Sequence, residues 1–207
     1  MKLNYKNFEI EILDEPNYII NSVENLRQYN NVYCYTNDYE DQFLPTSKHA
    51  IIISEFGEQV ASAIICDIGG GTGIYENAFI IDNDKIWIRI CNKIYCLEIP
   101  SLDLIWNKEF DTFTNLSIYQ HENDILIHGE LEIFRITKEG DLIWSFGGRD
   151  IWINTQGKAE FSIENNVIRL FDFESNEYVI DFNGNQIEDN PRIIQKKIKK
   201  KWWQIFC

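Results

Sequence analysis

The sequence predicts an all-β fold, a small or incomplete β-propeller-like repeat of four-stranded antiparallel units with a short C-terminal helix. Two patterns recur along the chain. Ile94–Leu97 returns as Ile133–Ile136 and as Val167–Leu170, after 39 and 34 residues, and Asp103–Trp106 returns as Asp141–Trp144, after 38. These spacings match the blade length of β-propellers. A hydrophobic content of 44%, with 14% aromatic residues, supplies the side chains that pack between such sheets.

The N-terminal third, residues 1–75, is the irregular part of a single domain expected to span residues 1–190. Apolar runs separated by polar breaks predict strands at residues 8–13, 18–23, 32–35, 50–54 and 60–66. Segments 14–17 and 56–58 carry the Pro, Asn and Gly typical of turns. Short alternating runs of this kind indicate strands that are less evenly spaced than those that follow.

Three repeat units follow, at residues 76–111, 112–149 and 150–187. Strands are predicted at 79–81, 85–90, 94–98 and 102–107, then at 116–119, 124–128, 131–136 and 142–146, and finally at 151–154, 158–163, 167–171 and 178–182. Trp106 and Trp144 are expected in the outer strands of consecutive units as packing residues. A closed propeller has four or more blades, so the three units alone do not predict whether the array closes into a ring or forms an open fan. An open fan would need its edges protected by charge, by the N-terminal strands or by a partner.

The charge is arranged unevenly. The net charge is −14, yet the last six basic residues all follow Pro191 with no acid among them, so the rest of the chain carries about −20. Such a body repels nucleic acid and attracts a basic protein partner, although an acidic surface also serves solubility alone. The N-terminus shows no signal peptide and no run is long enough to span a bilayer, so a cytoplasmic protein is expected. Five cysteines without metal-ligand spacing predict reduced thiols and no bound metal.

A glycine-rich segment, Cys66–Gly73, resembles the D-x-G-x-G-T-G loop of S-adenosylmethionine-dependent methyltransferases. That resemblance implies a cofactor site at Gly69–Gly73 and a helix directly after it. Residues 74–90 instead show period-two runs typical of strands. The favoured interpretation is a glycine-rich connection that lets two sheets approach closely, with no cofactor, and the methyltransferase is the alternative.

A second resemblance covers about residues 50 to 187. Segments 69–81, 94–97, 100–106, 127–133 and 144–151 look like those of a group of short, uncharacterised bacterial proteins built from propeller-type repeats. It implies a β-repeat fold and bacterial origin, but no activity or catalytic residue. By analogy, small acidic proteins of this kind can serve as immunity proteins that mask basic toxins.

Five residues are candidates for a binding site: Glu76, His128, Glu130, Arg149 and Asp150. Glu76, Arg149 and Asp150 lie at the starts of units, where propeller loops gather, and His128 and Glu130 flank a turn. A structural role for His128, and an ion pair or turn cap for Arg149 and Asp150, are the competing interpretations. No catalytic constellation is evident, so we expect a non-enzymatic protein-binding module.

The basic tail, residues 191–207, places Ile194, Ile198, Trp202 and Ile205 on one face of a predicted helix, with lysines opposite. It is expected to dock on the acidic body and cover a sheet edge. Peripheral contact with an anionic membrane is the alternative.

Overall fold

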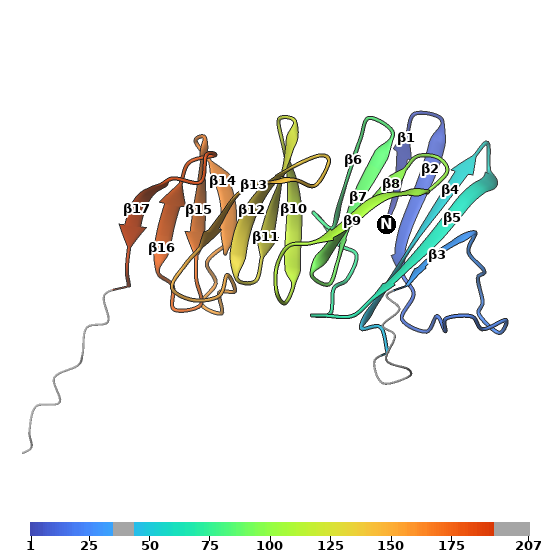
Figure 1. Ribbon diagram of the computed structural model, residues 1–207, viewed down its shortest axis with the longest axis horizontal. Coiled ribbons are helices and arrows are strands. Elements are labelled where there is room, and N and C mark those ends of the chain that lie inside the picture. Colours follow the sequence, from blue (N-terminus) through green and yellow to red (C-terminus); the bar gives the residue numbers. More distant parts are fainter. Residues whose placement is uncertain (35–43, 193–207) are drawn as a thin grey trace, which may run out of the picture.

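The structure is a computed structural model that describes residues 1–34 and 44–192, and these residues form seventeen strands in four sheets. The sheets follow one another in chain order along the long axis of the molecule (Figure 1). Sheet A has the order β1-β2-β4-β5-β3, and β3 joins β5 in parallel while the other pairs are antiparallel. Its strands are β1 (Lys2–Tyr5), β2 (Phe8–Asp14), β3 (Asn31–Cys34), β4 (Ser47–Glu55) and β5 (Glu58–Asp67).

The other three sheets are four-stranded antiparallel meanders, as the sequence predicts. Sheet B contains β6 (Phe79–Asp82), β7 (Lys85–Ile90), β8 (Lys93–Glu98) and β9 (Leu104–Glu109). Sheet C contains β10 (Asn115–His121), β11 (Asp124–Gly129), β12 (Glu132–Thr137) and β13 (Leu142–Gly147). Sheet D contains β14 (Phe161–Glu164), β15 (Val167–Phe171), β16 (Glu177–Ile180) and β17 (Gln186–Asn190).

The hydrophobic core lies between successive sheets rather than in one central layer. One cluster joins sheets A and B and includes Ile51 and Ile88, a second joins B and C around Trp87, and a third joins C and D around Trp152. Sheets rich in β-branched and aromatic residues present apolar groups on both faces, so each sheet needs a neighbour. Burial of these faces stabilises the stack by roughly 25 cal/mol per Å² of apolar area.

A tryptophan on the outer strand of one sheet packs on the last hairpin of the next sheet. The indole Nε1 of Trp106 donates to the Lys138 carbonyl at 3.1 Å, and that of Trp144 donates to the Phe182 carbonyl at 2.9 Å. Each indole lies close to a hairpin glycine with positive φ, Gly140 or Gly184. The predicted packing role of both tryptophans is confirmed.

Sheet A is tied to sheet B by a related contact. The Tyr33 hydroxyl on β3 donates to the carbonyl of Leu102, in the last hairpin of sheet B, at 2.7 Å, and Asn31 Nδ2 donates to the same carbonyl at 3.1 Å. The outer strand of each sheet from A to C therefore bonds to the hairpin of its successor.

Sheet D departs from this pattern on the face that has no successor. Trp87, Leu126 and Arg169 occupy equivalent positions on the second strands of sheets B, C and D. Their partners on the third strands are Cys96, Arg135 and Val179, respectively. By the same pairing, Glu188 on β17 occupies the position that Trp106 holds on β9 and Trp144 holds on β13. Arg169 forms ion pairs with Glu177 and Glu164. A polar outer face of this kind is typical of a capping repeat.

The far face of sheet A is covered by the chain itself. Tyr18, in the segment between β2 and β3, packs with Ala50, Ile64 and Cys66. Among the described residues, no hydrophobic cluster joins sheet D to sheet A, so the four sheets form an open array. The open fan is therefore what the structure shows, with charge on one end and the N-terminal segment on the other.

Two strand predictions are wrong. Segment 151–154 forms no strand, because buried Asn154 accepts from the backbone N–H groups of Gln156 and Lys158 and so folds the chain into a turn. Sheet D accordingly starts at β14 and takes β17 as its fourth strand. Segment 18–23 also forms no strand, since the Asn25 amide bonds both backbone groups of Ile19. The strand β1 was not predicted.

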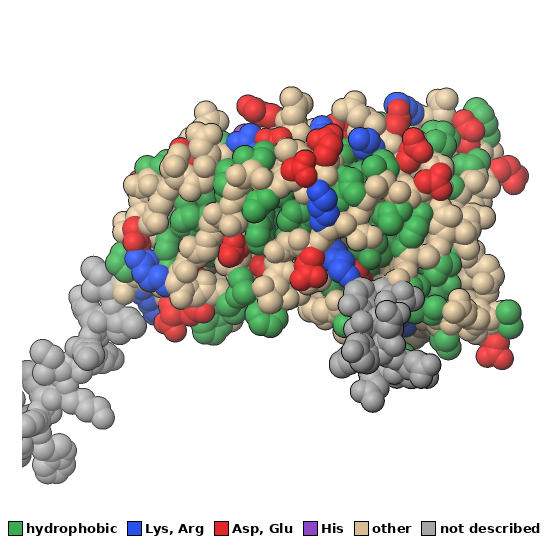
Figure 2. Space-filling model, viewed as in Figure 1, with side chains coloured by type: hydrophobic (Ala, Val, Ile, Leu, Met, Phe, Trp, Pro, Cys, Tyr) green, Lys and Arg blue, Asp and Glu red, His purple; other side chains and the backbone are tan. Residues whose placement is uncertain are grey.

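Residues 1–34 and 44–192 contain no helix, and hence none suited to crossing a membrane. The predicted C-terminal helix with Ile194, Ile198, Trp202 and Ile205 lies outside the described residues. Cys66, Cys91 and Cys96 are buried free thiols and Cys34 is a half-buried one. On the face shown in Figure 2, acidic and basic side chains are interspersed, and hydrophobic side chains show in several places rather than in one patch.

Candidate functional site

A cleft of about 460 Å³ opens where sheets B, C and D meet. One wall is the segment before β6, with Tyr75, Glu76 and Asn77. The floor comes from β10 and β11, and the opposite wall is the connection from β13 to β14 together with the start of β14. The lining residues beyond the first wall are Leu116, Ser117, Tyr119, His128, Trp152, Ile153, Glu160 and Phe161.

His128 on β11 is held in the floor by two hydrogen-bond contacts. Its Nε2 lies 3.1 Å from the carbonyl oxygen of Trp152, and its Nδ1 lies 3.3 Å from Ser117 Oγ. Burial lowers the pKa of His128 to about 4. The imidazole is therefore neutral at pH 7 and adds no positive charge to the cleft.

Three rings stack on one another at the cleft, and a fourth lies across from them. Phe161 stacks on Tyr119 with ring centroids 4.6 Å apart and on His128 with centroids 5.4 Å apart. Across the cleft, Tyr75 is 49% exposed and its hydroxyl donates to the Leu116 carbonyl at 3.1 Å. These contacts fix the rings and leave Tyr75 open to solvent.

Arg89 is a fully buried cation behind Tyr75. Its guanidinium carbon lies 4.4 Å from the centroid of the Tyr75 ring, and Nη2 donates to the Gly73 carbonyl at 3.1 Å. Nε and Nη1 have no hydrogen-bond partner among the described residues. Burial lowers the pKa of this guanidinium. Arg89 thus occupies one side of the Tyr75 ring without lining the cleft.

Of the five predicted site residues, the structure places Glu76 and His128 at the cleft and the other three elsewhere. Glu130 follows β11, where its backbone N–H donates to the Thr114 carbonyl at 2.8 Å. Arg149 forms an ion pair with Asp189 and lies 5.2 Å from the Tyr178 ring centroid. Asp150 accepts a hydrogen bond from the backbone N–H of Ile151 at 2.8 Å. Arg149 and Asp150 therefore act as an ion-pair partner and a turn cap, respectively, and not as a pair with each other.

The glycine-rich segment crosses from sheet A to sheet B at close range. A Cβ at Gly70 would lie 1.7 Å from Thr114 Oγ1, so only glycine fits. Its backbone donors are bonded within the chain: Gly69 N–H to Thr46 Oγ1, Gly70 N–H to the Phe113 carbonyl and Thr72 N–H to Ser47 Oγ. The segment leads into β6 and not into a helix. This is the geometry of a connection between closely packed sheets.

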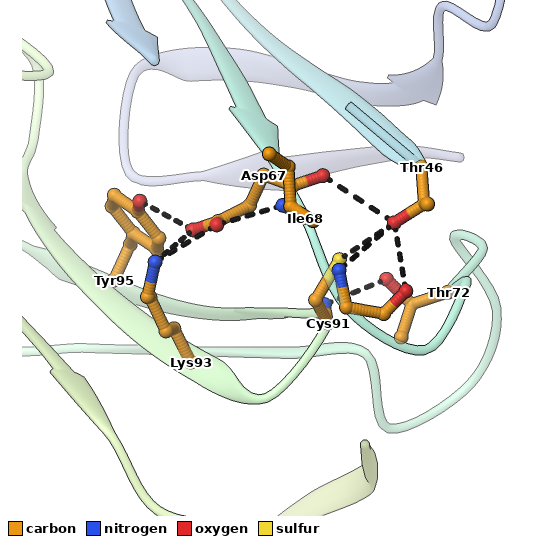
Figure 3. Close-up of polar contacts among 8 residues, drawn as sticks. Thr46, Asp67, Ile68, Thr72, Cys91, Lys93 and Tyr95 are labelled. Carbon is orange, nitrogen blue, oxygen red and sulfur yellow. Dashed lines mark hydrogen bonds and ion pairs between the residues drawn. The ribbon is translucent and has the colours of Figure 1, made fainter. Parts of the chain in front are cut away.

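The same junction holds a buried ion pair (Figure 3). Lys93 Nζ lies 2.8 Å from Asp67 Oδ1, and the Tyr95 hydroxyl donates to Asp67 Oδ2 at 2.7 Å. On its other side, Thr46 Oγ1 lies 3.4 Å from Cys91 Sγ. Burial, with the Asp67 contact as second cause, raises the pKa of Tyr95. Because both carboxylate oxygens have partners, Asp67 joins sheet A to sheet B structurally.

Two other buried carboxylates are also engaged by the fold. Asp111 accepts from the backbone N–H groups of Phe113 and Leu131, both at 2.8 Å. Asp172 accepts from the Tyr178 hydroxyl at 2.9 Å and from the Asn176 backbone at 2.8 Å. Over residues 1–34 and 44–192, no group of three or more His, Cys, Asp or Glu side chains is placed to hold a metal ion.

No protein-family model and no curated protein matches the chain. Solved structures with a related arrangement include BamB from Moraxella catarrhalis (TM-score 0.49, 14% identity, 68% of this chain and 42% of that chain) and the Neurospora crassa Pan2 WD40 domain (0.45, 14%, 57% and 39%). The computationally designed Ika8 protein is a third (0.48, 11%, 75% and 51%). The chain spans about half the length of these proteins or less. The likeness concerns the strand arrangement alone.

The strand pairing itself defines the class: an open array of propeller-type four-stranded sheets with a cleft across three of them. Sequence reasoning missed Tyr119, Glu160 and Phe161 as site residues. Tyr119 and Phe161 lie on the first strands of sheets C and D, whereas the sequence predicted the first strand of the third unit at residues 151–154 and so placed Phe161 on the second. Glu160 carried no signal of its own.

Proposed function

We propose that the chain is a non-enzymatic interaction module whose partner is a protein with a basic surface. The observation that carries this proposal is the charge of the cleft. Glu76 and Glu160 supply carboxylates from opposite walls, and no lysine or arginine lies among the lining residues. A concave, negatively charged surface on a chain of net charge −14 attracts a basic protein and repels an acidic one.

The absence of an assembled acid-base pair at this cleft supports binding rather than catalysis. The ring nitrogens of His128 contact Ser117 and a backbone carbonyl, and not a carboxylate. A histidine whose pKa burial has lowered to about 4 is a poor general base at neutral pH. The floor of the cleft is therefore a fixed binding surface.

Capture on immobilised protein tests the proposal. The wild-type chain should retain a basic protein from a lysate of its source at low salt and release it as salt rises, because screening weakens exposed charge pairs. A Glu76→Lys/Glu160→Lys variant should lose this capture. The matched control, Glu24→Lys/Glu58→Lys, changes the same net charge at exposed positions outside the cleft and should keep it. Equal capture by both variants would contradict the proposal.

The finer version of the proposal is an immunity-like role in a bacterial cytoplasm, where the chain would mask a basic toxin. The carboxylates of the cleft are complementary in charge to a basic toxin. Co-expression with a basic toxin identified as the captured partner gives the test: the chain should restore growth, and the Glu76→Lys/Glu160→Lys variant should not. Growth rescued equally by this variant would argue against masking through the cleft.

A further inference from the structure

We propose that the cleft takes an arginine side chain of the partner, with the guanidinium between Tyr75, Glu76 and Glu160. This inference rests on the proposed function, because it names the group that the interaction module recognises. Three properties of the cleft carry it: its charge, its open aromatic ring and the kind of hydrogen-bonding groups that remain available.

The charge selects a cation. Glu76 is exposed and Glu160 half-buried, and Glu160 uses Oε1 to accept from the Asn154 backbone N–H at 3.0 Å. Within residues 1–34 and 44–192, its Oε2 and the Glu76 carboxylate form no hydrogen bond or ion pair, so both can accept from a ligand. The opposing charge of Arg89 lies behind the Tyr75 ring and outside the lining. An anionic ligand would find two carboxylates and no cation at the cleft surface.

The aromatic surface selects a planar cation. Phe161, in the wall formed by the start of β14, is already stacked against Tyr119 and His128 of the floor. Tyr75 is held on one side by Arg89 and remains half exposed. A guanidinium can stack on such a ring and donate in-plane hydrogen bonds to carboxylates, whereas an ammonium offers a strongly hydrated point charge. The cleft should therefore favour arginine over lysine.

The available polar groups point the same way. The lining contributes carboxylates on both walls, while His128 is neutral and already bonded. A guanidinium carries five donors and no acceptor, so it matches a surface of acceptors. A metal ion is a poorer fit, because no three potential ligands gather among the described residues.

Titration followed by two-dimensional NMR of the full chain tests the inference. The probes are three blocked tripeptides, acetyl-Gly-X-Gly-amide, in which X is arginine, lysine or citrulline. Citrulline keeps the shape of arginine without its charge. The arginine peptide should cause saturable shifts at the Trp152 indole and at the Ile153 and Phe161 amides. Lysine should bind more weakly, and citrulline at least about ten-fold more weakly than arginine.

Variants locate the site. Glu76→Gln and Glu160→Gln should each weaken arginine binding about five-fold, the scale of a partly exposed charge pair, while Glu58→Gln should leave it unchanged. Equal binding of citrulline, no saturable binding, or shifts that survive both cleft variants would each overturn the inference. If arginine fails to bind but Glu76→Lys/Glu160→Lys still abolishes partner capture, the interaction module stands without this chemistry. If arginine binds and no basic protein is captured, the cleft assignment stands and the proposed function fails.

Discussion

His128 should make the protein lose stability in mild acid, and the size of the loss follows from its environment. Burial lowers the pKa of His128 from 6.5 to about 4. Between these two values the unfolded chain binds a proton at this position that the folded chain does not. The free energy of unfolding therefore falls as pH falls through this window, and it is unaffected by this group above about pH 7. At about 1.4 kcal/mol per pKa unit, the total loss is about 3 kcal/mol.

Urea unfolding at a series of pH values from 4 to 7.5 measures this effect. His49 adds a loss in the same direction, because burial lowers its pKa as well. The share of His128 is therefore the difference between the wild type and His128→Gln, whose amide can still donate to the Trp152 carbonyl. The variant should lose about 3 kcal/mol less than the wild type between pH 7 and pH 4. Identical pH dependence in both proteins would refute the assignment of a buried, neutral His128.

Three further predictions concern the stack, its end and the tail. Gly184→Ala should destabilise the fold by about 3 kcal/mol, since its Cβ would lie 2.8 Å from the Trp144 indole that packs on it. The control Gly157→Ala has a similar φ and open space around it, so it should cost about 1 kcal/mol. Equal losses of unfolding free energy in denaturant would contradict the packing contact. Arg169→Leu/Glu188→Trp should give sheet D the apolar outer face that sheets B and C have, and so cause self-association, measured by sedimentation velocity. An unchanged sedimentation coefficient would argue against the capping role. The full chain should bind anionic vesicles no better than a chain ending at residue 190, because the tail is expected on the acidic body; co-sedimentation that depends on the tail would favour membrane contact.

The repeat could be predicted from the sequence where hydrophobic pattern and turn chemistry agree. Sheets B and C match their predicted strands closely, because Asn, Asp or Gly lies at the turns that bound the apolar runs. The third unit was placed one strand out of register. Val167–Leu170 resembles β8 and β12, yet it forms the second strand of sheet D, and the outer strand β17 is polar and carries no tryptophan. The outer strand of sheet D therefore lacks the apolar and tryptophan pattern that marks the outer strands of sheets B and C.

The site was only partly predictable for a different reason. Glu76 was selected because it lies at the start of a unit and His128 because it lies beside a turn, and both line the cleft. Glu160 lies in a connection whose course depends on the Asn154 turn, and no local pattern reports it. The aromatic stack of Tyr119 and Phe161 joins two sheets, so it exists only once the sheets are stacked.

Site-specific photo-crosslinking tests most directly whether the cleft is the binding surface. Benzoylphenylalanine replaces Ile153, which lines the cleft, or Phe56, which is 91% exposed at the hairpin of sheet A. We expect the Ile153 position to crosslink a basic protein, with the attachment mapped by mass spectrometry to an arginine-containing segment, and the Phe56 position to give no such product. Crosslinking to the same partner from Phe56 alone, or equally from both positions, would contradict binding through the cleft.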